Sequence, residues 1–338
     1  MARLFIALVS AALALAPAPA KAHEKWFVDQ SSHPVDWSLV LSSRTLIAIG
    51  VALVFVAIFT LLQRAIGNPD WPRLPIFHRM APGAMTLLSV QTAIALISTA
   101  VQPALLAANL HLPSTTLGYT LAALEVLVAF SFITGLGDRI GASALALLWL
   151  ACAVLFGLPD ALEQLLYIGI AVAIFVIGRT APLAELPRPP FSSPEWGPRA
   201  LMILRVISGV SFLCLAIMDK IWTPGLGLAF LQEYPHFNVL RLAGLEWATD
   251  DLFVFLAGIV ETTIGALLIS GRLTRVVILG MWLPFNLTVP FLPPVEMLGH
   301  LPIFGIMYLL LVYGSGSASE HARLPTEEER SQVGSGGL

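Results

Sequence analysis

Three charged residues lie within or beside long apolar stretches, where charge is costly. Glu261 is near the middle of the apolar run 252–270, and Asp219 and Lys220 lie at the end of the run 200–221. A carboxylate at the centre of a bilayer costs about 2.5–3.5 kcal/mol on insertion scales, so it normally faces other helices and has a partner. Glu261 is therefore a candidate proton-accepting acid, with Lys220 as its counter-charge. The alternative is a neutral glutamic acid that hydrogen-bonds between helices and only holds them together.

The position of Lys220 leaves its partner open. At 1.5 Å per residue, Glu261 lies roughly 13 Å inside its helix, so a direct ion pair would need a tilted helix or a bridging water. Asp219 or Glu246 are alternative partners, and the lysine could also extend to the bilayer surface as an anchor. Adjacent helical residues diverge by about 100°, so only one of Asp219 and Lys220 faces a given partner.

Two further residues are candidates for contacting a cofactor. Glu125 occupies the middle of the run 117–135, at the same depth as Glu261, and Arg205 lies about one turn inside the run 200–221. The alternatives are packing between helices for Glu125 and a role as a surface anchor for Arg205.

Histidines raise the possibility of a metal site. Five of the seven histidines fall in segments that we place on the outer face, and His23, His33, His236 and His300 are the candidate ligands. If processing leaves His23 as the first residue, it offers an α-amine and an imidazole together, a pair that copper favours. Copper or zinc would suit these nitrogens, but no tight pair such as HxH is present, and histidines at membrane surfaces also occur without metal.

The elements that must position these residues are membrane helices. Hydrophobic residues make up 57% of the 338 residues and charged residues only 12%, against about 25% charged in soluble proteins. The 18 basic and 21 acidic residues leave no basic field for a nucleic acid. Cys152 and Cys214 both lie in apolar runs and form no ligand motif.

The apolar runs predict an all-α, polytopic transmembrane bundle of about nine spans. Residues 1–22 have the pattern of a signal peptide, with a small-residue cleavage site at Ala22. Continuous apolar runs of about 20 residues indicate helices. The expected spans are 38–63, 84–108, 117–135, 140–157, 162–179, 200–221, 252–270, 275–291 and 299–315.

Charge predicts the orientation. With the mature N-terminus outside, arginines gather on the inner side, whereas the outer loops hold only Lys25 and Arg241. This asymmetry follows the positive-inside rule. We expect a bacterial inner (plasma) membrane protein with a periplasmic N-terminus and a disordered cytoplasmic tail over 316–338.

The chain also contains an apparent internal repeat. Glu125, Gly135 and Arg139 recur 136 residues later as Glu261, Gly271 and Arg275, and Gly169 and Gly178 recur as Gly305 and Gly314. We infer two parallel four-helix units, 84–179 and 200–315, preceded by a segment 23–83 that holds one extra helix. The second unit carries the lysine and the longer outer loop.

The second unit has a distinctive pattern on two of its helices. One helix carries Leu204, Arg205, Gly209, Phe212 and Lys220, and the next, with the turn that ends it, carries Glu261, Gly265, Leu268, Gly271, Leu273, Thr274 and Arg275. In this pattern the second unit resembles the DoxX family of four-helix membrane proteins. The resemblance covers roughly 200–315 well and 84–179 in degenerate form. The sequence departs from the family at Met218 and Asp219, where a small residue often precedes the lysine. Relatives of this kind include the DoxD subunit of a thiosulfate:quinone oxidoreductase.

The resemblance implies a redox-associated membrane subunit linked to the quinone pool or to a periplasmic oxidoreductase or respiratory complex. No haem or flavin motif is visible, so the electron carrier would belong to the substrate or a partner. The first alternative is a transporter or a periplasmic copper- or zinc-handling protein, and the second is a non-catalytic assembly subunit. Whether the chain is itself an enzyme stays open.

Overall fold

The computed structural model describes residues 25, 28, 30–178, 196–288 and 294–316. The predicted signal peptide, His23 and nearly all of the predicted tail lie outside the described residues. Helices make up the fold, and the β pairing among the described residues is one isolated bridge between Ala104 and His111. The all-α prediction is therefore confirmed.

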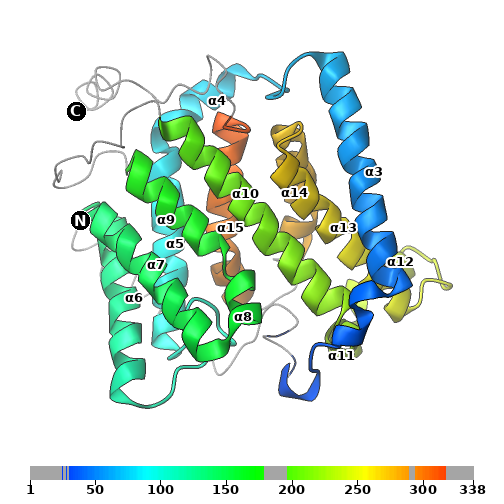
Figure 1. Cartoon of the computed structure of the whole chain (residues 1–338), viewed down its shortest axis with the longest axis horizontal. Coiled ribbons are helices and arrows are strands. Elements are labelled where there is room, and N and C mark those ends of the chain that lie inside the picture. Colours follow the sequence, from blue (N-terminus) through cyan, green and yellow to red (C-terminus); the bar gives the residue numbers. More distant parts are fainter. Residues whose placement is uncertain (1–24, 26–27, 29, 179–195, 289–293, 317–338) are drawn as a thin grey trace.

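The long helices run across the molecule from one end to the other (Figure 1). They are α3 (Ser43–Ile66), α5 (Ala84–Val101), α6 (Thr116–Thr134), α7 (Asp138–Phe156), α9 (Leu166–Ile177), α10 (Gly197–Leu215), α13 (Asp250–Ser270), α14 (Thr274–Thr288) and α15 (Pro294–Tyr313). Short helices lie at the two ends: α4 (Pro75–Met80), α8 (Leu158–Glu163), α11 (Pro224–Glu233) and α12 (Val239–Leu242). We call the two ends of the molecule the α8 end and the Gly271 end.

Six of these helices are long and apolar enough to cross a membrane. They are α3, α5 with the short turn before it, α6, α7, α10 with the segment after it, and α13. The other three predicted spans correspond to α9, α14 and α15, which have 12, 15 and 20 residues. Twelve residues of helix rise only about 18 Å, well short of a 30 Å hydrocarbon core. The membrane assignment is thus supported, with six candidate spans among the described residues.

Polar side chains and glycines set the helix boundaries. Ser42, Thr115 and Thr249 cap the N-termini of α3, α6 and α13 by accepting hydrogen bonds from backbone N–H groups three residues on. Gly135 and Gly271 end α6 and α13 in the left-handed conformation, at φ of 72° and 68°, which side chains disfavour. These glycines end both helices at the Gly271 end.

Two arginines bind equivalent carbonyls in the two halves of the chain. Arg139 Nε donates to Phe175 O at 3.0 Å, and Arg275 Nε donates to Leu311 O at 2.8 Å. Both the donors and the acceptors are 136 residues apart. The first bond ties the start of α7 to the last turn of α9, and the second ties the start of α14 to the last turn of α15.

The packing crosses the boundary between the two predicted units. Helix α5 packs along α6 and along α15 of the other unit, while α10 packs along α13 and along α9 of the other unit. The main hydrophobic core accordingly draws residues from both halves. The two four-helix units therefore share one core, and α3 packs outside it against α13.

Candidate functional site

The charged site is built around a short π-helix that follows α10. This segment, η5 (Ala216–Ile221), widens the helix by one residue per turn and points Asp219 and Lys220 toward different neighbours. π-Helical turns occur often at functional sites. The sequence pattern predicted an ordinary helix here, because no propensity signal distinguishes a π-turn within an apolar run.

Lys220 and Glu261 form an ion pair across α10–η5 and α13. The Lys220 Nζ lies 3.3 Å from Glu261 Oε2, and the side chains are 11% and 31% exposed. Glu261 Oε2 is shielded from solvent and accepts no further hydrogen bond from the described residues. The depth of Glu261 in its helix left open whether Lys220 reaches it, and the structure shows that the two side chains pair directly.

Three glycines make that pairing possible. A Cβ on Gly209 would lie 2.8 Å from the Gly265 carbonyl oxygen, and a Cβ on Gly265 would lie 2.8 Å from that of Gly209. At Gly258, a Cβ would lie 3.1 Å from Lys220 Cβ. Because these positions lack side chains, α13 approaches α10 and η5 closely, and the lysine spans the remaining distance along the helix to Glu261.

His300 lies on α15 and interacts electrostatically with Glu261. Its side chain is buried at 4% exposure, and its ring contacts Phe304 at a centroid distance of 6.1 Å. The sequence placed His300 in an outer loop as a metal ligand, whereas the structure places it in a helix. Lys220, Glu261 and His300 together form what we call the intramembrane polar site.

A second charged cluster lies on another side of η5. Lys25 forms an ion pair with Glu163, and its Nζ lies 2.8 Å from Asp219 Oδ1 and 3.9 Å from Asp160 Oδ1. Gln30 Nε2 donates to Asp160 at 3.4 Å. We call Lys25, Asp160, Glu163 and Asp219 the Lys25 cluster. Asp219 therefore pairs with Lys25, while Lys220, the next residue, pairs with Glu261.

Burial and neighbouring charges both shift the pKa values of this cluster. Burial alone would lower the pKa of Lys25, but the carboxylates of Asp219 and Glu163 outweigh it and raise that pKa. On α8, burial raises the pKa of Asp160, against the effect of Lys25. Burial and the nearby Asp219 also raise the pKa of Glu163. Three carboxylates thus share one buried ammonium group.

Sequence analysis missed Lys25, Asp160 and Glu163. Lys25 lies three residues after the predicted cleavage site and was counted only as an outer-loop charge. A signal was present, because the chain has only three lysines, Lys21, Lys25 and Lys220, and the structure describes the last two. Both of them lie in ion pairs within the bundle.

Glu125 and Arg205 each bind backbone groups. Glu125 is fully buried and accepts hydrogen bonds from Leu106 N at 2.7 Å and Thr99 Oγ1 at 3.3 Å. Arg205 donates to Ser315 O at 2.9 Å and to the carbonyls of Leu268 and Ile269 at the end of α13. In these positions Glu125 fixes the loop after α5 and Arg205 caps α13, and neither lies in the two charged clusters.

The other candidate metal ligands are dispersed. His33 packs against Gly225, and His236 is exposed with its ring 4.5 Å from that of Phe237. Within the part of the chain that the structure describes, no three His, Cys, Asp or Glu side chains are arranged to hold a metal ion. The described residues therefore do not fit the copper or zinc site expected from His33, His236 and His300.

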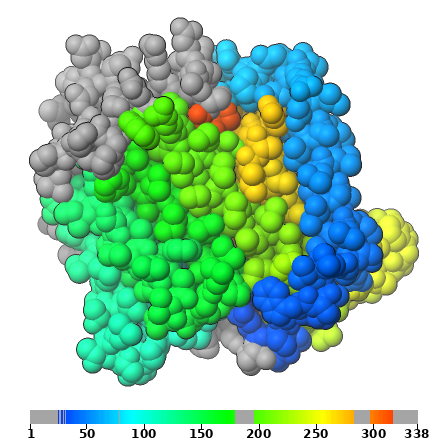
Figure 2. Space-filling view, viewed as in Figure 1, coloured from blue at the N-terminus to red at the C-terminus, as the bar shows by residue number. Residues whose placement is uncertain are grey.

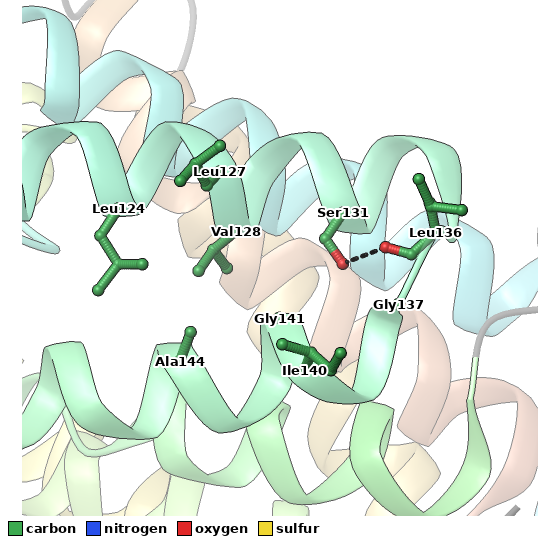
Figure 3. A pocket seen from close by; sticks show the side chains of 9 residues that line it. All are labelled: Leu124, Leu127, Val128, Ser131, Leu136, Gly137, Ile140, Gly141 and Ala144. Carbon is green, nitrogen blue, oxygen red and sulfur yellow. Dashed lines mark hydrogen bonds between the residues drawn. The ribbon is translucent and has the colours of Figure 1, made fainter. Parts of the chain in front are cut away.

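An apolar groove lies apart from both charged clusters, between α6 and α7 (Figure 3). Its volume is about 430 Å³, and its polar side chain Ser131 already donates to Leu136 O at 2.9 Å. Leu127 and Ile140 on its walls are among the most exposed apolar side chains. The groove has the character of a surface that faces lipid rather than of a reaction site.

No protein family, no curated protein and no solved structure matches this chain.

Proposed function

We propose that this protein is a DoxX-like, redox-associated membrane subunit that binds a quinone head group at the intramembrane polar site. The observation that carries the proposal is the Lys220–Glu261 ion pair, held 3.3 Å apart within candidate membrane spans, with buried His300 in electrostatic interaction with Glu261. Ionisable groups inside membrane spans mark proton, ion or substrate sites by default. The resemblance of residues 200–315 to the DoxX family supports the same function.

The residue types suit a quinone. A quinone presents two carbonyl oxygens that accept hydrogen bonds, and its two-electron reduction adds one proton to each of them. Lys220 is a donor, His300 is a donor or acceptor according to its protonation, and Glu261 exchanges a proton as a carboxylic acid. The apolar surfaces of the surrounding helices suit a lipid-soluble ligand. Because no haem or flavin motif is visible in the sequence, the electrons would come from a partner oxidoreductase.

The proposal includes the finer topology. We propose nine membrane crossings, formed by α3 and two parallel four-helix repeats, in a bacterial inner membrane with the mature N-terminus outside. The equivalent bonds of Arg139 and Arg275 support the repeat, because donors and acceptors keep one offset. The α8 end then faces the periplasm and the Gly271 end the cytoplasm. A periplasmic oxidoreductase would dock at the α8 end.

A titration with a short-chain ubiquinone tests the proposed function. Trp222 adjoins η5, so quenching of tryptophan fluorescence should report binding to the purified protein. We expect saturable quenching in the wild type and at least a tenfold weaker affinity in Lys220→Met, because a charge-assisted hydrogen bond contributes about 1.5–3 kcal/mol. Lys220→Arg should retain most of the affinity. Absence of saturable binding in the wild type would refute the quinone site.

A proton-coupled transporter is the second candidate. The observation that favours it is the pair of charged clusters beside η5, which together extend from the α8 end toward the middle of α13. Quinone-independent proton uptake by proteoliposomes, lost in Glu261→Gln, would favour this function over the first.

A further inference from the structure

A strap from the N-terminal segment closes the α8 end over η5. The described residues of 25–42 bind this end at successive points, and Figure 2 shows their surface (blue) against the green and yellow-green surface of α8 and the end of α10. Asp36 N donates to Trp222 O at 3.1 Å, and the rings of Trp37 and Trp222 lie 5.7 Å apart. Behind the strap, Trp222 Nε1 donates to Thr45 Oγ1 at 3.1 Å.

Lys25 is the charged anchor of this strap. Its side chain is 3% exposed, and it reaches carboxylates from two different elements, Asp160 and Glu163 on α8 and Asp219 on η5. Further strap contacts include a long hydrogen bond from Gln30, the packing of His33 against Gly225, and the ring contact and backbone bond to Trp222. Loss of one partner from a buried ion pair is strongly destabilising, so Lys25 should dominate the free energy of closure.

The cluster and the intramembrane polar site are joined through two adjacent residues. Asp219 pairs with Lys25, and Lys220, the next residue, pairs with Glu261. Without Lys25, Asp219 would be a buried carboxylate that lacks its cation. Lys220 is a cation and the next residue along the chain, so Asp219 would compete with Glu261 for it.

We propose that Lys25 is a latch and a positioning residue: it holds the strap over η5 and, by engaging Asp219, keeps Lys220 paired with Glu261. The closure of the strap rests on the structure of the α8 end alone. Its effect on quinone affinity rests on the proposed function. Two measurements therefore test the two parts separately.

The thiol of Cys214 provides the first measurement. It lies two residues before η5, is half-buried, and interacts electrostatically with Glu163. We would measure its alkylation rate in the full-length protein with Cys152→Ala. Lys25→Ala should raise the rate at least about tenfold, since breaking a buried ion pair exceeds the free energy of a tenfold change. Lys25→Arg should react like the wild type.

Matched controls separate the latch from a general loss of stability. Arg44→Gln removes a cation from the more exposed pair with Asp251 on α13 and should leave the Cys214 rate unchanged. Added ethylammonium should restore protection to Lys25→Ala, because a small alkylammonium ion replaces the missing group. It should not restore protection when Asp219→Asn is also present.

An unchanged rate of Cys214 alkylation in Lys25→Ala, or an equal rise in Arg44→Gln, would overturn the latch. If Lys25→Ala does not fold, Lys25→Gln replaces it in the same series.

Quinone affinity provides the second measurement. In Lys25→Ala the affinity for short-chain ubiquinone should fall, and in Lys25→Ala/Asp219→Asn it should recover, because the competing carboxylate has been neutralised. No recovery in the double variant would overturn the positioning role. A wild type that binds no quinone would instead refute the proposed function, and the alkylation rates would still decide the latch.

Discussion

At the scale of single residues, two glutamates at matching positions in the sequence have different surroundings. Glu125 accepts hydrogen bonds from Leu106 N and Thr99, both neutral donors, and is sealed in the core. Glu261 is partly exposed and pairs with the charged Lys220. A neutral donor set favours a packing role, whereas a lysine partner inside a membrane favours a role in binding or proton exchange. The two residues therefore form a matched pair for mutation.

Glu261→Gln should lower the free energy of unfolding by about 1–2 kcal/mol, because Lys220 loses its paired charge in a partly exposed setting. Glu125→Gln should cost less than about 1 kcal/mol, since an amide oxygen still accepts from Leu106 N. Thermal unfolding in detergent, followed by the loss of native tryptophan fluorescence, compares the two. Equal losses in both variants would show that Glu261 has no special charged partner.

The Lys25 cluster also predicts how stability depends on pH. Asp160 and Glu163 have pKa values raised by burial, so between their ordinary values near 4 and their folded values the folded state binds more protons than the unfolded state. Stability should therefore fall as pH rises through this window. In Glu163→Gln, the stability measured by thermal unfolding should depend less steeply on pH between pH 5 and 8. This range lies roughly above the ordinary carboxyl pKa.

Asp36 provides a control of opposite sign. It is exposed, and its hydrogen bonds with Ser38 lower its pKa, so its contribution is present above the ordinary value and is lost as pH falls. Asp36→Asn should leave the slope between pH 5 and 8 unchanged. A slope that is the same in Glu163→Gln and Asp36→Asn would contradict the assignment to the cluster.

At the scale of elements, the site depends on the close crossing of α10 and α13. Gly209 and Gly265 face each other at this crossing, and Gly258 faces Lys220. Gly209 and Gly265 are among the residues on which the expected DoxX resemblance rests, whereas Gly258 is not. The close approach itself could not be predicted, because it depends on which faces of two helices meet. The π-turn of η5 was missed for the same reason, since its hydrogen bonds are set by tertiary contacts.

Gly265→Ala should widen the crossing and destabilise the protein by about 1–3 kcal/mol, the usual cost of overpacking. It should also weaken quinone binding, because Lys220 and Glu261 move apart. Gly280→Ala on α14 is the matched control, since a Cβ there meets nothing within 4 Å. Equal unfolding temperatures for the two variants would contradict the close crossing.

At the scale of the whole molecule, sequence predicted the class of fold and not its packing. The apolar runs predicted the long helices to within a few residues for α6 and α13, because length and hydropathy alone mark a span. Two self-contained bundles were the simple expectation from the repeat. The observed packing of α5 on α15 and of α10 on α9 exchanges partners between the halves, which no local pattern encodes. The partners of Lys25 were unpredictable for a related reason, as they lie more than 130 residues away in the sequence.

The proposed orientation predicts the result of reporter fusions. Alkaline phosphatase inserted after Glu246, in the loop before α13, should be active because it is exported. A fluorescent protein fused after residue 338 should fluoresce in the cytoplasm. The arginines that flank the Gly271 end are the physical reason, since basic residues stay on the cytoplasmic side. An active phosphatase at the C-terminus would contradict the nine-crossing topology.

The central claim is that the intramembrane polar site binds a quinone, and native mass spectrometry of the gently purified protein tests it most directly. One spectrum reports both the mature N-terminus and any retained ligand. We predict a chain that begins at His23 and carries one isoprenoid quinone, with the quinone lost in Glu261→Gln and kept in Glu125→Gln. A wild-type chain without quinone, or equal retention in the two variants, would contradict the account.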